Sequence, residues 1–156
     1  MNPAEQEEWI LYKKMHANRL YKHSQFTSAF APYLEALTGS MLLQDPSLQV
    51  TLLCNLASCL TRTGNLEEAL SLTDAALVID TSNSRALERR GFVLFSMGYH
   101  EEALESLTQC INISTDTAIQ NQASSLIQRI GKKKQNGSST SPSSTILSEL
   151  TKCINS

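Results

Sequence analysis

The sequence predicts an all-α protein, a right-handed superhelical stack of three helix-turn-helix units closed by a capping helix. The main observation is a repeat: Gly64 and Gly98 are 34 residues apart, and so are Ala69 and Ala103 (98 − 64 = 34; 103 − 69 = 34). A fixed period of 20 to 50 residues is typical of repeat proteins, whose units bury their apolar faces against one another. The 41% apolar and 18% charged composition is ordinary for such a globular domain.

The first unit is expected over residues 4–40. Asn2 is a helix-capping residue followed by proline, so a helix should begin almost at the N-terminus and run to about Tyr21. A polar turn follows, and a second helix should start near Phe26. Glycine is a common helix terminator, so we expect Gly39 to end this helix.

The second and third units are expected over residues 46–80 and 83–114. Asp45 followed by proline repeats the cap signature, and the third helix should reach a turn at Gly64. The fourth helix should then run from residue 66 to about residue 78. A cluster of cap-forming residues precedes the fifth helix, which should end at Gly98, and the sixth should reach about residue 111.

The three units align on small or matched residues where paired helices should cross closely. The aligned triplets are Ala29, Tyr33 and Ala36, then Ala69, Thr73 and Ala76, then Ala103, Leu107 and Cys110. The offset between the first two triplets is 40 (69 − 29 = 40), six more than the inner period. We expect those extra residues to lengthen the loop around residues 39–47, where repeat arrays tolerate insertion.

The stack should be closed by a capping helix over residues 116–131, which carries one apolar stripe on a polar background. Domain residues 1–131 should be followed by a flexible linker over 132–145, which is rich in Ser, Thr, Gly and Pro. The last segment, 146–156, has the apolar spacing of a short marginal helix. Lys132 to Lys134 are expected to be solvated charges at a helix end.

Composition and motifs favour a binding protein over an enzyme. The net charge of −2 gives no support for nucleic-acid or membrane partners. The acidic N-terminus is unlike a signal peptide, so we expect a cytosolic or nuclear protein with its cysteines as thiols. No metal-ligand spacing, phosphate-binding loop or nucleophile motif is present, so we expect neither cofactor nor metal, and no catalytic residues.

Polar residues on the first helix of each unit point to a ligand, because those helices should line the inner groove. Lys14 and Asn18 are four residues apart and share one helix face, and Arg85 and Arg89 do the same on the fifth helix. Asn55 lies on the third helix. Lysine, arginine and asparagine are suited to bind carboxylates, and a peptide C-terminus carries a carboxylate that internal segments lack.

These residues resemble the carboxylate clamp of tetratricopeptide-repeat (TPR) co-chaperones, the class that binds the Glu-Glu-Val-Asp tails of heat shock proteins 90 and 70. That clamp has Lys and Asn four apart in the first helix, Asn in the third, and Lys-x-x-x-Arg in the fifth. The chain matches it with Lys14-Met-His-Ala-Asn18, Asn55 and Arg85-Ala-Leu-Glu-Arg89. The resemblance covers about residues 4–130.

The resemblance implies a role for each residue and an affinity for the ligand. Lys14, Asn18 and Asn55 would surround the terminal carboxylate. Arg85 would bind the last acidic side chain, and Arg89 that carboxylate or an upstream carbonyl. A few charged hydrogen bonds of about 1.5 to 3 kcal/mol each, less the cost of ordering a flexible tail, imply roughly micromolar binding.

The chain departs from the family pattern at two positions: Arg85 replaces the commoner lysine, and Ala17 replaces the usual glycine. Two alternatives to a co-chaperone stay open: a scaffold that binds another peptide or complex, and the targeting part of an enzyme whose catalytic domain lies elsewhere. The cations Lys13, Lys22 and Arg90 have no place in the clamp pattern and are expected to be surface charges.

Overall fold

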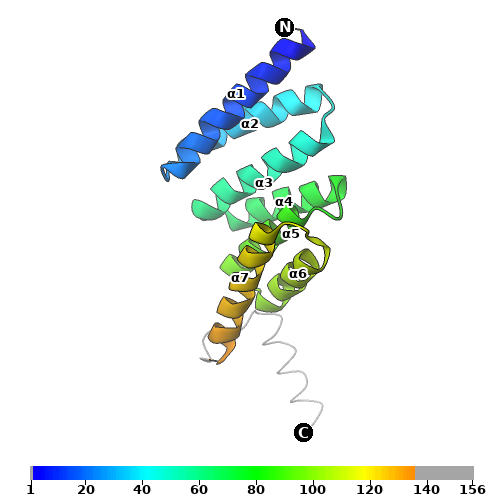
Figure 1. The fold of residues 1–156 in the computed structure, drawn as a ribbon. Helices are drawn as coiled ribbons and strands as arrows, with labels where there is room; N and C mark the ends of the chain where they lie inside the picture. Colours follow the sequence, from blue (N-terminus) through cyan, green and yellow to red (C-terminus); the bar gives the residue numbers. More distant parts are fainter. Residues whose placement is uncertain (1, 136–156) are drawn as a thin grey trace.

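The computed structural model describes residues 2–135, which form seven helices. They are α1 (Pro3–Lys22), α2 (Phe26–Leu42), α3 (Pro46–Arg62), α4 (Leu66–Ile79), α5 (Ser84–Met97), α6 (His100–Ile113) and α7 (Thr117–Gln135). Each helix packs on the next along the chain, and α5 also packs on α3 and α7. The result is the predicted all-α stack of three helix-turn-helix units plus a capping helix (Figure 1).

The caps at the starts of the first helices of all three units are formed as expected. The Asn2 side chain accepts a hydrogen bond of 2.8 Å from the backbone N–H of Glu5, whose carboxylate closes the capping box. The Asp45 carboxylate accepts one of 3.1 Å from Leu48 N–H. Asn83 caps α5 in the same way. These side chains satisfy backbone donors that no intrahelical partner reaches, which fixes where the helices begin.

The turns inside the units place one residue in the left-handed region. Gly64 has φ +86° and Gly98 has φ +87°, a conformation that costs glycine little. Ser24 occupies the equivalent position in the first unit (24 + 40 = 64) with φ +60°. The first unit therefore makes the same turn with a less suitable residue, and the glycine repeat does not extend to it.

Two expectations about the first unit are wrong. Gly39 lies inside α2, which continues to Leu42, and a Cβ at Gly39 would lie 2.7 Å from Ile10 Cγ1. The glycine therefore permits close approach of α1 and α2 instead of ending a helix. The six extra residues are also helical, because α2 and α3 have 17 residues each where α4 and α5 have 14.

The capping helix is longer than predicted. It continues past Gly131 and through Lys132–Lys134 to Gln135, so the expected start of the linker at residue 132 is wrong. The rest of the predicted linker, 136–145, and the predicted tail, 146–156, lie outside the described residues. Basic residues at the end of α7 are favourable to the helix dipole.

The core follows the repeat alignment. All nine aligned residues at the helix crossings are buried, with exposed fractions of 0 to 3%. Their small size in most positions lets the paired helices approach closely. Among residues 2–135, none of the seven helices combines the length and the hydropathy that a membrane span requires.

Candidate functional site

A hollow of about 290 Å³ opens among α1, α2, α3 and α5. It is lined by Asn18, Tyr21, Lys22, Tyr33, Asn55, Ser58 and Arg89. Three of the five predicted ligand-binding residues, Asn18, Asn55 and Arg89, thus share one surface although they come from three different units. The three units stack so that their first helices bring these residues together, as the alignment of the repeats predicts.

Asn18 is oriented by a residue of the second helix. The Tyr33 hydroxyl donates a hydrogen bond to Asn18 Oδ1. Burial raises the pKa of Tyr33 above its ordinary value, so its hydroxyl keeps the proton that it donates. With its oxygen engaged, the Asn18 carboxamide presents its two N–H donors to a ligand. Tyr33 therefore has a positioning role as well as its predicted packing role.

Asn55 is half-buried in the wall of the hollow. Among the described residues, no hydrogen-bond partner engages its carboxamide. Ser58, one turn further along α3, donates to the Cys54 carbonyl at 3.1 Å and lines the hollow beside it. Asn55 can therefore donate to a ligand carboxylate and accept from a peptide N–H without first breaking a protein contact.

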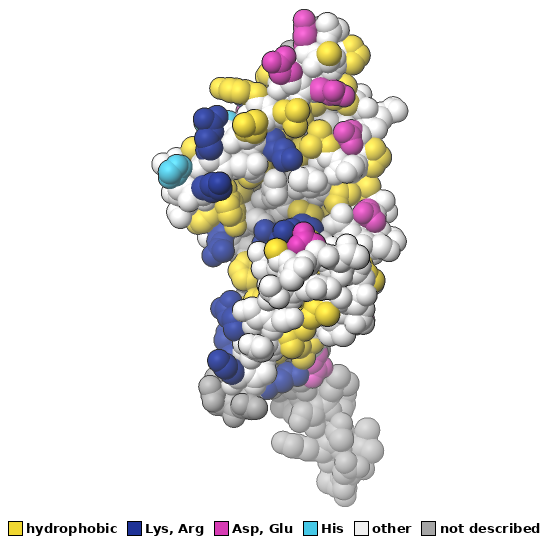
Figure 2. All heavy atoms as spheres, viewed as in Figure 1, with side chains coloured by type: hydrophobic (Ala, Val, Ile, Leu, Met, Phe, Trp, Pro, Cys, Tyr) yellow, Lys and Arg dark blue, Asp and Glu magenta, His cyan; other side chains and the backbone are white. Residues whose placement is uncertain are grey.

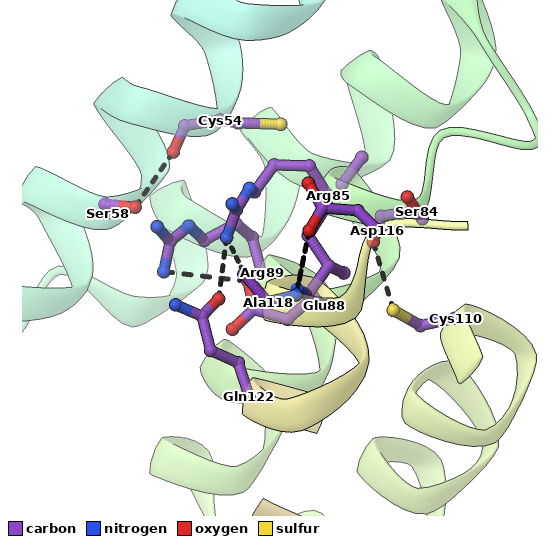
Figure 3. Close-up of polar contacts among 12 residues, drawn as sticks. Cys54, Ser58, Ser84, Arg85, Glu88, Arg89, Cys110, Asp116, Ala118 and Gln122 are labelled. Carbon is purple, nitrogen blue, oxygen red and sulfur yellow. Dashed lines mark hydrogen bonds and ion pairs between the residues drawn. The ribbon is translucent and has the colours of Figure 1, made fainter. Parts of the chain in front are cut away.

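Arg85 and Arg89 flank a buried carboxylate that sequence reasoning did not single out. Glu88 is 3% exposed, and its Oε2 lies 3.6 Å from Nη1 of Arg85 and 3.6 Å from Nη1 of Arg89. Arg85 Nη1 also donates to Gln122 Oε1 of α7 at 2.7 Å. Figure 3 shows these four side chains gathered between α5 and α7. The capping helix thus holds one of the predicted ligand-binding residues.

The buried carboxylate lowers the charge of the site. Lys14, Arg85 and Arg89 contribute +3, and Glu88 reduces this to +2. Glu88 Oε2 and Arg89 Nε are buried without a hydrogen-bond partner among the described residues, so the arginine and the carboxylate attract each other as charges at 3.6 Å. The arrangement orients both guanidinium groups before any ligand arrives.

Lys14 lies one turn before Asn18 on α1 and is half-buried, but it is not among the residues that line the hollow. Lys22, expected to be a plain surface charge, does line it. The other two cations expected on the surface are paired: Lys13 with Glu35 at 2.9 Å, and Arg90 with Asp74 at 2.9 Å. Figure 2 shows Lys and Arg side chains along one edge and across the middle of this face, whereas Asp and Glu side chains lie toward the top, along the opposite edge and beside the central band.

Sequence signals exist for two of the residues that were missed. Glu88 lies three residues after Arg85, a spacing that allows an ion pair on one helix. Lys22 lies four residues after Asn18, on the face of α1 already assigned to the groove. The bond from Tyr33 has no sequence signal, because it depends on how α2 crosses α1.

The cysteines and acidic residues that the structure describes point to no other kind of site. Burial raises the pKa of Cys54, Cys59 and Cys110 to about 11, which keeps them as unreactive thiols at neutral pH. Within residues 2–135, no group of His, Cys, Asp and Glu is arranged to hold a metal ion.

Comparison with known families and proteins supports the repeat assignment. Residues 84–117 match the family model described as tetratricopeptide repeat. Human zinc finger CCCH domain-containing protein 7B is 29% identical over 143 residues, which is 83% of this chain and 15% of that protein. Outer envelope protein 61 of Arabidopsis thaliana is 31% identical over 108 residues, 66% of this chain and 19% of that protein. The chain spans less than a fifth of the length of either relative.

Solved structures share the fold at low sequence identity. The first TPR of Spaghetti (RPAP3), bound to the HSP90 peptide SRMEEVD, matches with TM-score 0.66 and 20% identity over 82% of this chain and 94% of that one. The second TPR domain of human RPAP3, in complex with the HSP70 peptide SGPTIEEVD, matches with TM-score 0.65 and 20% identity over 81% and 98%. The type III secretion translocator chaperone SycD of Yersinia enterocolitica matches with TM-score 0.67 and 17% identity over 81% and 95%.

Proposed function

We propose that the tetratricopeptide-repeat domain formed by residues 2–135 binds the acidic C-terminal tail of heat shock protein 90, heat shock protein 70 or both. In this role the protein is a non-catalytic adaptor or co-chaperone. The observation that carries the proposal is the shared hollow, in which Asn18, Asn55 and Arg89 converge from three units.

The chemistry of the hollow suits a terminal carboxylate. Asn18 presents N–H donors, Asn55 has an uncommitted carboxamide, and Arg89 supplies a charged planar donor. Lys14 and Arg85 extend the positive charge on either side along α1 and α5. A carboxylate placed here would exchange water for several charge-assisted hydrogen bonds, which are about twice as strong as neutral ones.

The solved neighbours support this ligand class by similarity. Two RPAP3 domains of the same fold are bound to peptides that end in Glu-Glu-Val-Asp. The SycD chaperone has the same fold, however, so fold alone does not identify a ligand. The proposal therefore depends on the five predicted clamp residues, three of which line the hollow, and not on the overall resemblance of the folds.

The second candidate is a scaffold that binds another peptide through the same groove. It is favoured by the relatives, because the matched region is under a fifth of each one and neither name identifies a co-chaperone. A domain of a longer protein would bring its partner to whatever else that protein carries. Both candidates are consistent with a cytosolic or nuclear location.

Calorimetric titration with two peptides tests the proposal. Met-Glu-Glu-Val-Asp with a free C-terminus is compared with the same peptide amidated at that end. We expect roughly micromolar binding of the free acid and at least about tenfold weaker binding of the amide. Equal affinity for the two peptides would exclude a carboxylate clamp, and binding of neither would favour the second candidate.

A further inference from the structure

Two cations occupy equivalent positions in the first two units, at the C-terminal ends of helices that line the groove. Lys22 is the last residue of α1, and Arg62 is the last residue of α3. Their separation (62 − 22 = 40) equals the offset between the first two units. Equivalent positions in stacked repeats lie on the same side of the array, so both side chains belong to the groove side of the helices.

Arg62 is held in place by aromatic side chains. Its guanidinium carbon lies 5.9 Å from the ring centre of Phe26 and 5.6 Å from that of Phe92. Its Nε donates to the Tyr21 hydroxyl at 3.5 Å. These contacts fix the guanidinium through its faces and Nε, which leaves the two Nη groups as donors for a ligand.

Within residues 2–135, acidic groups pair with other cations and not with these two. Four other cations form ion pairs: Lys13, Arg85, Arg89 and Arg90. In the described part of the chain, by contrast, no carboxylate pairs with Lys22 or Arg62. Lys22 and Tyr21 also line the same hollow as Asn18 and Arg89, so the two cations are continuous with the candidate site.

The spacing along α1 relates the two cations to the ligand. Lys14 and Lys22 are eight residues apart, a rise of about 12 Å along the helix. An extended peptide covers about 3.3 to 3.6 Å per residue, so a chain anchored near Lys14 reaches Lys22 about three to four residues upstream of its C-terminus.

We propose that Lys22 and Arg62 form a second anion site that binds an acidic or phosphorylated side chain about three to four residues before the C-terminal residue of the ligand. The inference rests on the proposed function, because it uses the anchored C-terminus to set the register. It adds a selection rule: tails with a negative charge at this distance bind more tightly than tails without one.

A purely structural role is the competing explanation, since basic residues at helix C-termini favour the helix dipole. The third unit argues against such a requirement. The position equivalent to Arg62 is Ser96 (62 + 34 = 96), and the last turn of α5 has no basic residue. The fold therefore forms this helix end without a cation.

The test uses four free-acid peptides and three forms of the whole chain. The peptides are Met-Glu-Glu-Val-Asp and three variants in which its first two residues, four and three positions before the C-terminal Asp, are both Gln, both Glu or both phosphoserine. The proteins are the unchanged chain, the Lys22→Gln/Arg62→Gln double variant, and Arg19→Gln as a control. Arg19 is an exposed cation near the same end of α1 that does not line the hollow.

We expect the unchanged chain to bind the Glu peptide roughly fivefold more tightly than the Gln peptide, and the phosphoserine peptide at least as tightly as the Glu peptide. This preference for the charged peptides should disappear in the double variant and persist in Arg19→Gln. A gain confined to phosphoserine would assign the site to a phosphorylated tail, and a gain with both would assign it to acidic tails in general.

Equal binding of the Gln, Glu and phosphoserine peptides, or a preference for the charged peptides that survives in the double variant, would overturn the inference. Lower thermal stability of the double variant with an unchanged charge preference would assign the two cations to helix ends alone. The amidated Met-Glu-Glu-Val-Asp peptide separates this failure from failure of the proposed function, because it reports on the terminal carboxylate and not on the upstream residue.

Discussion

The two sides of the groove differ in how their polar groups are satisfied. On the α5 side, Arg85 and Arg89 already face Glu88, and Gln122 of the capping helix holds Arg85. On the α1–α3 side, Asn55 has no partner within the described residues, and Lys22 has no acidic one. The protein thus pairs the charges of one half of the site internally and leaves the donors of the other half open to the ligand, with Tyr33 orienting Asn18 on that half.

This difference indicates how affinity and specificity are divided. Ordering the side chains of the α5 side on binding costs little free energy, because the guanidinium groups are already oriented. Its internal carboxylate also weakens the field that attracts an anion. The α1–α3 side contributes donors that gain their partners from the ligand, so its residues can be removed without exposing a buried charge.

The largest effect should follow from Arg89→Ala, which damages both the site and the fold. We expect binding to weaken by more than about tenfold and the free energy of unfolding to fall by about 2 kcal/mol, because Glu88 loses one of its two charge partners. Titration and denaturant unfolding measure the two quantities.

A second variant separates these two losses. Adding Glu88→Gln to Arg89→Ala removes the stranded charge, so stability should recover while binding stays weak. Recovery of both would mean that Arg89 acts through Glu88 and does not itself contact the ligand.

Asn55→Ala should affect binding alone. We expect about tenfold weaker binding, equivalent to about 1.4 kcal/mol, with helicity and melting temperature unchanged. Asn121→Ala, an exposed position on α7, is the matched control and should bind normally. A melted Asn55→Ala protein would assign the residue to the core and remove it from the site.

The positions of the helices, and the residues that face the groove, were predictable because capping residues and the repeat period determine them. Capping residues such as Asp45 and left-handed glycines such as Gly98 mark element ends through backbone chemistry alone. Gly39 was misassigned because its role is to admit Ile10 from another helix, a contact that local sequence does not reveal.

The candidate site was predictable in its residues but not in its internal bonding. The repeat period places Asn18 and Asn55 on the groove, whereas the bond from Tyr33 and the contact between Arg85 and Gln122 depend on how neighbouring helices cross. Glu88 is likewise buried on a helix that packs against α3, α4, α6 and α7, and this packing is not visible in the local sequence.

Glu88→Gln should strengthen binding, in contrast to the other groove variants. Removing the internal negative charge restores the full charge of Arg85 and Arg89, so we expect roughly fivefold tighter binding of an acidic peptide. Affinity should also fall more steeply as salt is added. Weaker binding by this variant would mean that the orientation Glu88 imposes matters more than its charge.

Tyr33→Phe should have a smaller effect on binding. It removes the hydroxyl that holds Asn18 Oδ1 but keeps the buried ring, so we expect roughly threefold weaker binding and little change in fold. Asn18→Ala should then cost less in this background than in the unchanged chain. Fully additive losses in the double variant would show that Tyr33 does not act through Asn18.

His100 should affect stability and leave binding unchanged, because it lies outside the groove. It is buried against Phe95, and burial, together with Lys133 and Lys134, lowers its pKa below the ordinary 6.5. The folded state therefore resists protonation more than the unfolded chain does. Its contribution to stability is complete above pH 6.5 and is lost as pH falls below it.

Thermal unfolding of the unchanged chain and of His100→Phe, measured between about pH 7.5 and pH 5, tests this expectation. The variant should lose less stability across that range. Parallel curves for the two proteins would show that other groups cause the acid sensitivity.

The central claim is that a free C-terminal carboxylate lies between the two asparagines. The most direct measurement is the NMR shift of the Asn18 and Asn55 side-chain amide signals during titration with Met-Glu-Glu-Val-Asp, as free acid and as amide. We predict that both signals move with the free acid and stay in place with the amide at the same concentration. Equal shifts with both peptides, or shifts confined to helices outside the groove, would contradict the claim.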